Sequence, residues 1–67
     1  MDAKTIAATF RANLTFDEAR SALVAFADDK ANHGRDRLAA CEALLDLRTG
    51  RSMQSTMSRF RKKIGGK

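Results

Sequence analysis

Hydrophobic residues recur along this chain at intervals of three and four positions, which is the spacing of helices that bury one face. The clearest stripe predicts one helix with a shared apolar side: Phe16, Ala19, Leu23, Val24 and Ala27. Thr15 and Glu18 have the spacing of a capping box, so we expect this helix to begin at Phe16. Gly34 tolerates the left-handed conformation that closes a helix, so we expect the helix to end within residues 31–34.

Two further stripes predict a short helix before this one and a longer helix after it. Residues 4–13 place Ile6 and Phe10 on one side of the short helix. Residues 36–48 carry a broader apolar face, which predicts the central and most buried helix: Leu38, Ala40, Cys41, Leu44, Leu45 and Leu47. A free cysteine in such a face behaves as a small hydrophobe, so we expect Cys41 to pack in the core.

A four-residue break at positions 49–52 separates that helix from the last one. Gly50 suits the end of the preceding helix, and Ser52 suits the start of the next, which we expect to stop at Gly65 and Gly66. Four apolar residues share one side of this last helix: Met53, Met57, Phe60 and Ile64. The other side is polar and basic: Ser55, Arg59 and Lys62, with Ser58 and Lys63 on its shoulders.

The composition agrees with an all-α fold and limits its size. The chain has 67 residues, is rich in alanine, leucine and basic residues, and lacks proline, tyrosine and tryptophan. We therefore expect a single compact domain of three or four helices over residues 1–67, with a thin core. One cysteine and one histidine cannot form an internal disulfide or a Cys/His zinc site, so we expect neither a metal nor a cofactor.

The distribution of charge divides the chain into two parts. All eight acidic residues lie before position 47, and residues 1–47 carry a net charge of −2. Residues 48–67 contain seven basic residues and no acidic one. This division indicates a polyanion-binding segment attached to a mildly acidic body, with a merely solubilising basic tail as the alternative. No apolar run approaches the ~20 residues of a membrane span, so we expect a soluble, cytoplasmic protein without a membrane partner.

The remaining polar residues do not form a catalytic set. Asp28 and Asp29 are adjacent, so they point about 100° apart on a helix instead of converging on one substrate. We expect His33, beside Gly34, to cap a helix end. The chain has no phosphate-binding glycine loop and no nucleophile elbow. We therefore expect neither an enzyme nor a small-molecule substrate.

Residues 54–60, with the sequence Gln-Ser-Thr-Met-Ser-Arg-Phe, resemble the start of the recognition helix in helix-turn-helix DNA-binding proteins. The resemblance implies that residues 36–48 are the supporting helix and that the C-terminal pair is helix-turn-helix-like. It further implies that Met57 is buried and that four polar residues contact bases or backbone: Gln54, Ser55, Ser58 and Arg59. In this register the turn glycine stands at Gly50 rather than at position 51, and Leu47 occupies the place of a small residue.

Together these features predict a small transcriptional regulator that binds duplex DNA, with RNA as a variant, through its last helix and the preceding turn. The predicted contact residues are Arg48, Arg51, Ser52, Gln54, Ser55, Ser58, Arg59, Arg61, Lys62 and Lys63. We expect a homodimer that uses apolar surface from the first two helices: Ile6, Phe10, Phe16 and Phe26. The alternative is a helical inhibitor or adaptor whose basic helix docks on an acidic protein. A basic amphipathic helix lying on an anionic membrane is a less favoured third interpretation.

Overall fold

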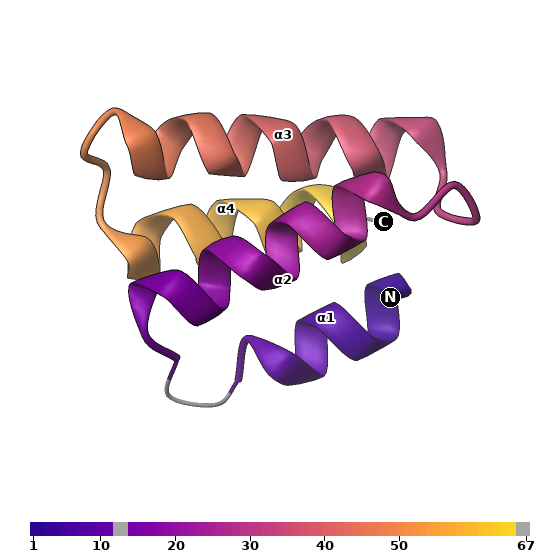
Figure 1. Cartoon of the computed structure of the whole chain (residues 1–67), viewed down its shortest axis with the longest axis horizontal. Helices are drawn as coiled ribbons and strands as arrows, with labels where there is room; N and C mark the ends of the chain where they lie inside the picture. The colour runs from indigo at the N-terminus through magenta and orange to yellow at the C-terminus, as the bar shows by residue number, and fades with distance from the viewer. Residues whose placement is uncertain (12–13, 66–67) are drawn as a thin grey trace.

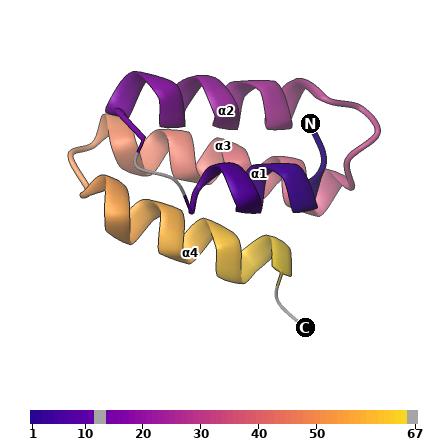
Figure 2. The same ribbon diagram turned by 90° about the horizontal axis from the view of Figure 1, so that it is seen from below.

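The computed structural model describes residues 1–11 and 14–65, and these residues form four helices and no strand. The helices are α1 (Ala3–Thr9), α2 (Phe16–Asp28), α3 (Gly34–Arg48) and α4 (Met53–Gly65). Each helix runs opposite to the one before it, and the four surround one core as an up-down-up-down bundle (Figures 1 and 2). The predicted all-α domain is confirmed. Within the described residues, no helix has the length and apolar character that crossing a membrane requires.

The first helix is shorter than its predicted span of residues 4–13. It begins after Asp2, whose carboxylate accepts a hydrogen bond from the Thr5 N–H at 2.8 Å, and it ends at Thr9. Ile6 and Phe10 point into the core as predicted, with 0% and 4% of their surface exposed. Residues 12 and 13 of the predicted helix lie outside the described residues, as does the predicted stop at Gly66.

The capping box of α2 forms as predicted, but the buried face of the helix is different. The Thr15 N–H donates to Glu18 Oε1 at 2.9 Å, and the Glu18 N–H donates to Thr15 Oγ1 at 3.2 Å. Phe16 and Val24, predicted to be buried, are 48% and 39% exposed. The side chains that α2 buries are Ala19, Ala22, Leu23 and Phe26. Phe16 and Val24 lie outside this buried stripe, on its edge.

The connection between α2 and α3 does not use its glycine to end a helix, contrary to prediction. The Asp29 carboxylate accepts from the Ala31 N–H at 2.9 Å, and the Asn32 side chain donates to the Phe26 carbonyl at 3.0 Å. These side-chain bonds turn the chain without a left-handed residue. Gly34 instead becomes the first residue of α3, which starts two positions before its predicted start. His33 is the N-cap, and its Nδ1 accepts from the Arg35 N–H at 3.3 Å.

The face of α3 that the sequence predicts to be buried is the wrong one. Leu38 and Leu45 are 59% and 58% exposed, and Cys41 between them is also exposed rather than packed in the core. The core face consists mainly of alanines: Ala39, Ala40, Ala43 and Leu47. Alanines allow a helix to approach its neighbours closely, so the larger side chains are left on the outer side.

The turn between α3 and α4 forms as predicted. Gly50 has a φ of +98°, in the left-handed region that favours glycine. The Gly50 N–H donates to the Leu47 carbonyl and the Arg51 N–H to the Asp46 carbonyl, which is a Schellman motif at the end of α3. The Ser52 hydroxyl oxygen accepts from the Ser55 N–H at 3.2 Å and so caps the start of α4.

Phe60 of α4 joins the helices at the centre of the core. Its ring meets Phe10 edge-on at 5.7 Å between centroids and Phe26 at 5.5 Å. Met57 is buried as expected, and Met53 and Ile64 are partly buried against the same core. Because Ile6, Phe10 and Phe26 are all buried here, they cannot supply the predicted dimer contact. Of the four residues proposed for that contact, only Phe16 is exposed.

Candidate functional site

The outer side of α4 carries positive charge only. The helix docks through Met57 and Phe60, and its opposite side faces solvent. No residue from Met53 to Gly65 is acidic. Five of the predicted contact residues on this helix are exposed: Gln54, Arg59, Arg61, Lys62 and Lys63. Ser55 and Ser58 are partly buried, so their hydroxyls lie nearer the body of the protein than the basic side chains do.

The cations on the α3 side of this surface are paired with carboxylates of α3. Lys63 Nζ lies 2.7 Å from Glu42 Oε1, and Arg51 Nε lies 3.7 Å from Asp46 Oδ2. Exposed pairs of this kind contribute little stability, roughly 0 to 1 kcal/mol. They nevertheless reduce the positive potential along the α3 side of α4. At the turn, Arg48, Arg51 and Ser52 are all exposed, but the Arg51–Asp46 pair makes this a region of mixed charge.

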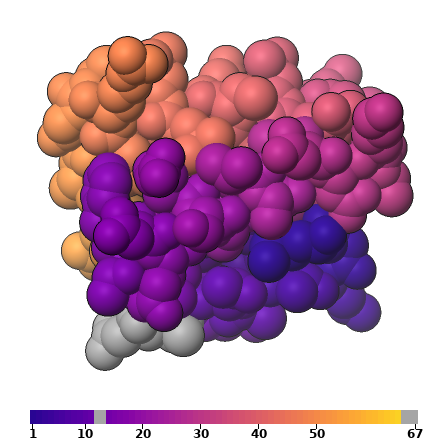
Figure 3. Space-filling view, viewed as in Figure 1, coloured from indigo at the N-terminus to yellow at the C-terminus, as the bar shows by residue number. Residues whose placement is uncertain are grey.

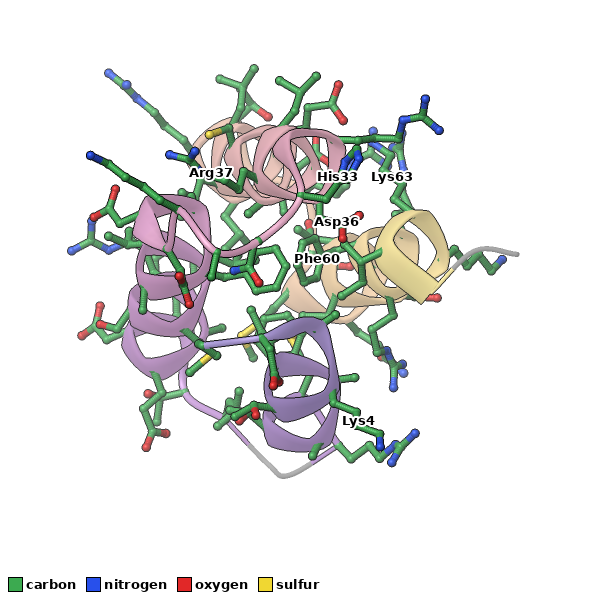
Figure 4. All side chains as sticks on the ribbon, turned by 90° about the vertical axis from the view of Figure 1, so that its right-hand side faces the viewer. Lys4, His33, Asp36, Arg37, Phe60 and Lys63 are labelled. Carbon is green, nitrogen blue, oxygen red and sulfur yellow. The ribbon has the colours of Figure 1, made fainter. Side chains whose placement is uncertain are left out.

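The α1 side of α4 adds Arg11 and Lys4, two cations that the predicted contact residues do not include. Arg11 and the predicted contact Arg61 line a groove of about 520 Å³ between the end of α1 and α4. Lys4 projects from α1 on the side of the molecule where α4 lies (Figure 4). Arg11 follows two residues after the end of α1. The signal in the sequence is that residues 3–11 contain no acid.

The packing of α4 against α3 defines how this surface is presented. In both views the two helices lie alongside each other and run in opposite directions, as an antiparallel hairpin (Figures 1 and 2). In a helix-turn-helix the second helix crosses the first at about 90–120° and projects from the body. Here α4 exposes its whole outer side rather than its first turns.

Titratable groups with shifted pKa values lie away from this surface. Hydrogen bonds from Thr5 lower the pKa of Asp2, and hydrogen bonds from Thr15 lower that of Glu18. The pKa of Asp29 is lowered chiefly by its hydrogen bond with the Met1 ammonium group. These carboxylates stabilise helix ends and a turn. Within residues 1–11 and 14–65, no three His, Cys, Asp or Glu side chains are placed to share a metal ion.

Comparisons with family models, with curated proteins and with solved structures found no match to this chain. The fold and surface define a small all-α domain in which one helix presents a positively charged outer side.

Proposed function

We propose that this protein binds nucleic acid, and duplex DNA in particular, through the outer side of α4. The observation that carries the proposal is that α4 is fixed to the core by one face while every charge on its other face is positive. Lysine and arginine bind phosphates regardless of sequence, and Gln54, Ser55 and Arg59 have side chains that can also contact base edges. A small regulator of transcription is the role that fits these properties.

The experiment is a fluorescence-anisotropy titration of labelled duplex DNA at ~50 and ~200 mM salt. If four or five phosphates are contacted, the slope of log affinity against log salt is about −4, and affinity falls by about two orders of magnitude. A double variant, Arg59→Ala with Lys62→Ala, should weaken binding and flatten the slope. The matched control is Lys30→Ala with Arg35→Ala, which removes two exposed cations beside the α2–α3 connection. Equal losses in both variants would contradict a site on α4.

The second candidate is a protein module that docks α4 on an acidic partner. The antiparallel hairpin favours it, because the first turns of α4 do not project as those of a recognition helix do. If the wild-type protein fails to bind duplex DNA at tens of micromolar in ~50 mM salt, this candidate replaces the first. Binding to an RNA duplex but not to DNA would keep the polyanion surface and change the ligand.

We also propose that two copies pair through α2 and α3, which lie side by side on one face (Figure 3). These two helices carry the exposed large hydrophobic residues of the described helices: Phe16, Val24, Leu38 and Leu45. They also carry exposed charges of both signs, which a second copy can pair: Asp17, Glu18, Arg20, Asp28 and Arg48. The α1 and α4 side would instead repel its own copy.

Sedimentation velocity at micromolar protein tests this pairing. We expect the wild type to sediment as a dimer and the double variant Leu38→Ser with Leu45→Ser to sediment as a folded monomer. Because α1 and α4 lie on the other side of the bundle, such a dimer turns its two cationic surfaces outward (Figure 4). A wild-type monomer, both free and on DNA, would remove the homodimer from the proposal.

A further inference from the structure

We infer that the groove between α1 and α4 is a binding site for the sugar–phosphate backbone, with Arg11 and Arg61 as its phosphate ligands. This inference rests on the proposed nucleic-acid function and makes it specific. It assigns the main contact to the α1 side of α4, whereas the helix-turn-helix resemblance assigns base and backbone contacts to four polar residues in the first half of the helix: Gln54, Ser55, Ser58 and Arg59.

The two sides of α4 differ in charge. On the α3 side, Glu42 and Asp46 are already within ion-pair distance of Lys63 and Arg51. On the α1 side, no described residue from Ala3 to Arg11 or from Met53 to Gly65 is acidic. A phosphate that enters the groove between Arg11 and Arg61 therefore meets cations without displacing a carboxylate, because Asp2 lies at the other end of α1, near Lys4.

The lining of the groove combines polar and apolar side chains. Arg11, Gln54 and Arg61 supply its polar side chains, and the remaining lining is apolar: Phe10, Leu14, Met53 and Met57. Two guanidinium groups can each bind a phosphate through paired N–H donors, and the Gln54 amide can donate as well. The apolar lining suits the deoxyribose carbons between successive phosphates, and methionine side chains adapt to irregular surfaces. The groove thus offers contacts to both parts of the backbone.

The flanking cations are spread along both elements. Lys4 lies on α1, Arg11 lies two residues beyond the end of that helix, and Lys62 follows Arg61 on α4. Lys4 and Arg11 are separated by on the order of 10 Å along the helix direction, which exceeds the ~3.4 Å of duplex axis between successive phosphates of one strand. Lys4 and Arg11 can therefore follow one strand past the groove instead of competing for a single phosphate.

The test compares two double variants that each remove two positive charges from α4 or its neighbours. One is Arg11→Ala with Arg61→Ala in the groove, and the other is Arg51→Ala with Lys63→Ala on the α3 side. Both are titrated against the same labelled 20-base-pair duplex across a salt series, after circular dichroism confirms that each is folded. We expect the groove variant to flatten the salt slope by about 1.8 and to weaken binding on the order of 50-fold at 100 mM salt. The α3-side variant should change the slope by less than about 0.9.

A third variant, Arg11→Lys with Arg61→Lys, separates a bidentate contact from charge alone. We expect it to keep most of the salt slope, because the charges remain, while its affinity falls several-fold through loss of the guanidinium geometry. Equal losses from the groove and α3-side variants would overturn the groove as the main site and leave DNA binding by α4 intact. A wild-type protein that binds polyglutamate but no duplex would overturn both the proposed function and this inference.

Discussion

The helix pairs α1/α4 and α2/α3 occupy opposite sides of one bundle, and they differ in both charge and exposed apolar surface (Figure 4). α2 and α3 contain six of the eight acidic residues and all the large hydrophobic side chains exposed on the described helices. α1 and α4 contain no acidic residue, and their large apolar side chains are buried or partly buried. One bundle thus separates a surface suited to polyanions from a surface suited to protein contact.

This separation does not follow the order of the chain. The sequence divides at position 47 into an acidic body and a basic end, but folding brings α1 from the body against α4. Like charges that face each other across α1 and α4 repel, and the repulsion is screened by salt over about 8–10 Å. A bound polyanion relieves the same repulsion. The α1/α4 surface therefore costs stability in the free protein and recovers it on binding.

The largest expected effect comes from the residue that holds the two pairs together. Phe60→Ala removes a 1%-exposed ring that contacts Phe10 on one pair and Phe26 on the other. Truncation of a buried phenylalanine costs about 3–5 kcal/mol, which is comparable with the whole stability of a domain this small. We expect Phe60→Ala to be largely unfolded at 25 °C when followed by far-UV circular dichroism.

The matched control is Phe16→Ala, since Phe16 is 48% exposed on α2. It should cost less than about 1.5 kcal/mol in urea unfolding, and it should lower self-association more than stability. If both substitutions destabilise equally, Phe60 is not the junction of the two pairs, and the core is not organised around it.

Alanine substitutions should have opposite effects on stability at the two ends of α3. Gly50 has a φ of +98°, so Gly50→Ala forces an alanine into the left-handed region at a cost of about 1–2 kcal/mol. Gly34 lies at the first position of α3, and a Cβ there would meet no atom within 4 Å. Gly34→Ala should therefore stabilise the protein by about 0.4–1 kcal/mol, because it restricts the unfolded chain.

Urea midpoints for the two alanine variants measure these opposite signs. The reverse order, with Gly34→Ala the more harmful, would mean that the α2–α3 connection needs a glycine after all. The two glycines look equivalent in the sequence, since each stands where an apolar pattern breaks. They differ because side chains of Asp29 and Asn32 make the first turn, while backbone geometry makes the second.

That contrast explains how far the sequence could predict the fold. The helix ends could be predicted because each depends on residues within a few positions of one another. The capping box of Thr15 and Glu18 is confirmed, and so is the turn formed by Gly50 and Ser52. The face that α3 buries depends on how closely α2 and α4 approach it. The sequence of α3 contains two stripes that could face the core, one with Leu38 and Leu45 and one of alanines. Hydrophobicity alone predicts that the leucine stripe is buried, whereas the structure buries the alanines.

For the candidate site too, the sequence could predict local features but not tertiary contacts. The basic outer side of α4 follows from helical periodicity and the absence of acids after position 47. The pairing of Lys63 with Glu42 and the position of Arg11 beside Arg61 depend on tertiary contacts across more than 20 and about 50 residues. No local pattern encodes those distances. Lys4 and Arg11 could be recognised as cations of a segment without acidic residues, but not as neighbours of α4.

The smallest expected effect concerns the caps of α2 and α4. Hydrogen bonds from the Thr15 backbone and hydroxyl lower the pKa of Glu18 from its ordinary value of 4.5. Since the folded pKa is the lower one, the contribution of this carboxylate is fully present above pH 4.5 and is lost as pH falls through the folded value. The cap of α4 is the Ser52 hydroxyl, which does not titrate in this range.

Melting temperatures of two cap variants at pH 7 and at pH 2.5 distinguish these caps. Glu18→Gln should melt below the wild type at pH 7, and the difference should be smaller at pH 2.5, because the wild-type carboxylate is increasingly protonated as pH falls. Ser52→Ala should melt below the wild type by a similar amount at both pH values, since its cap carries no charge. If the Glu18→Gln difference persists in acid, the capping box stabilises α2 through the shape of its hydrogen bonds rather than through the carboxylate charge. Protonation of Glu18 would then not explain any loss of stability in acid. The α2 and α4 caps would respond to pH in the same way, and the two helix pairs would differ only in their surface charges.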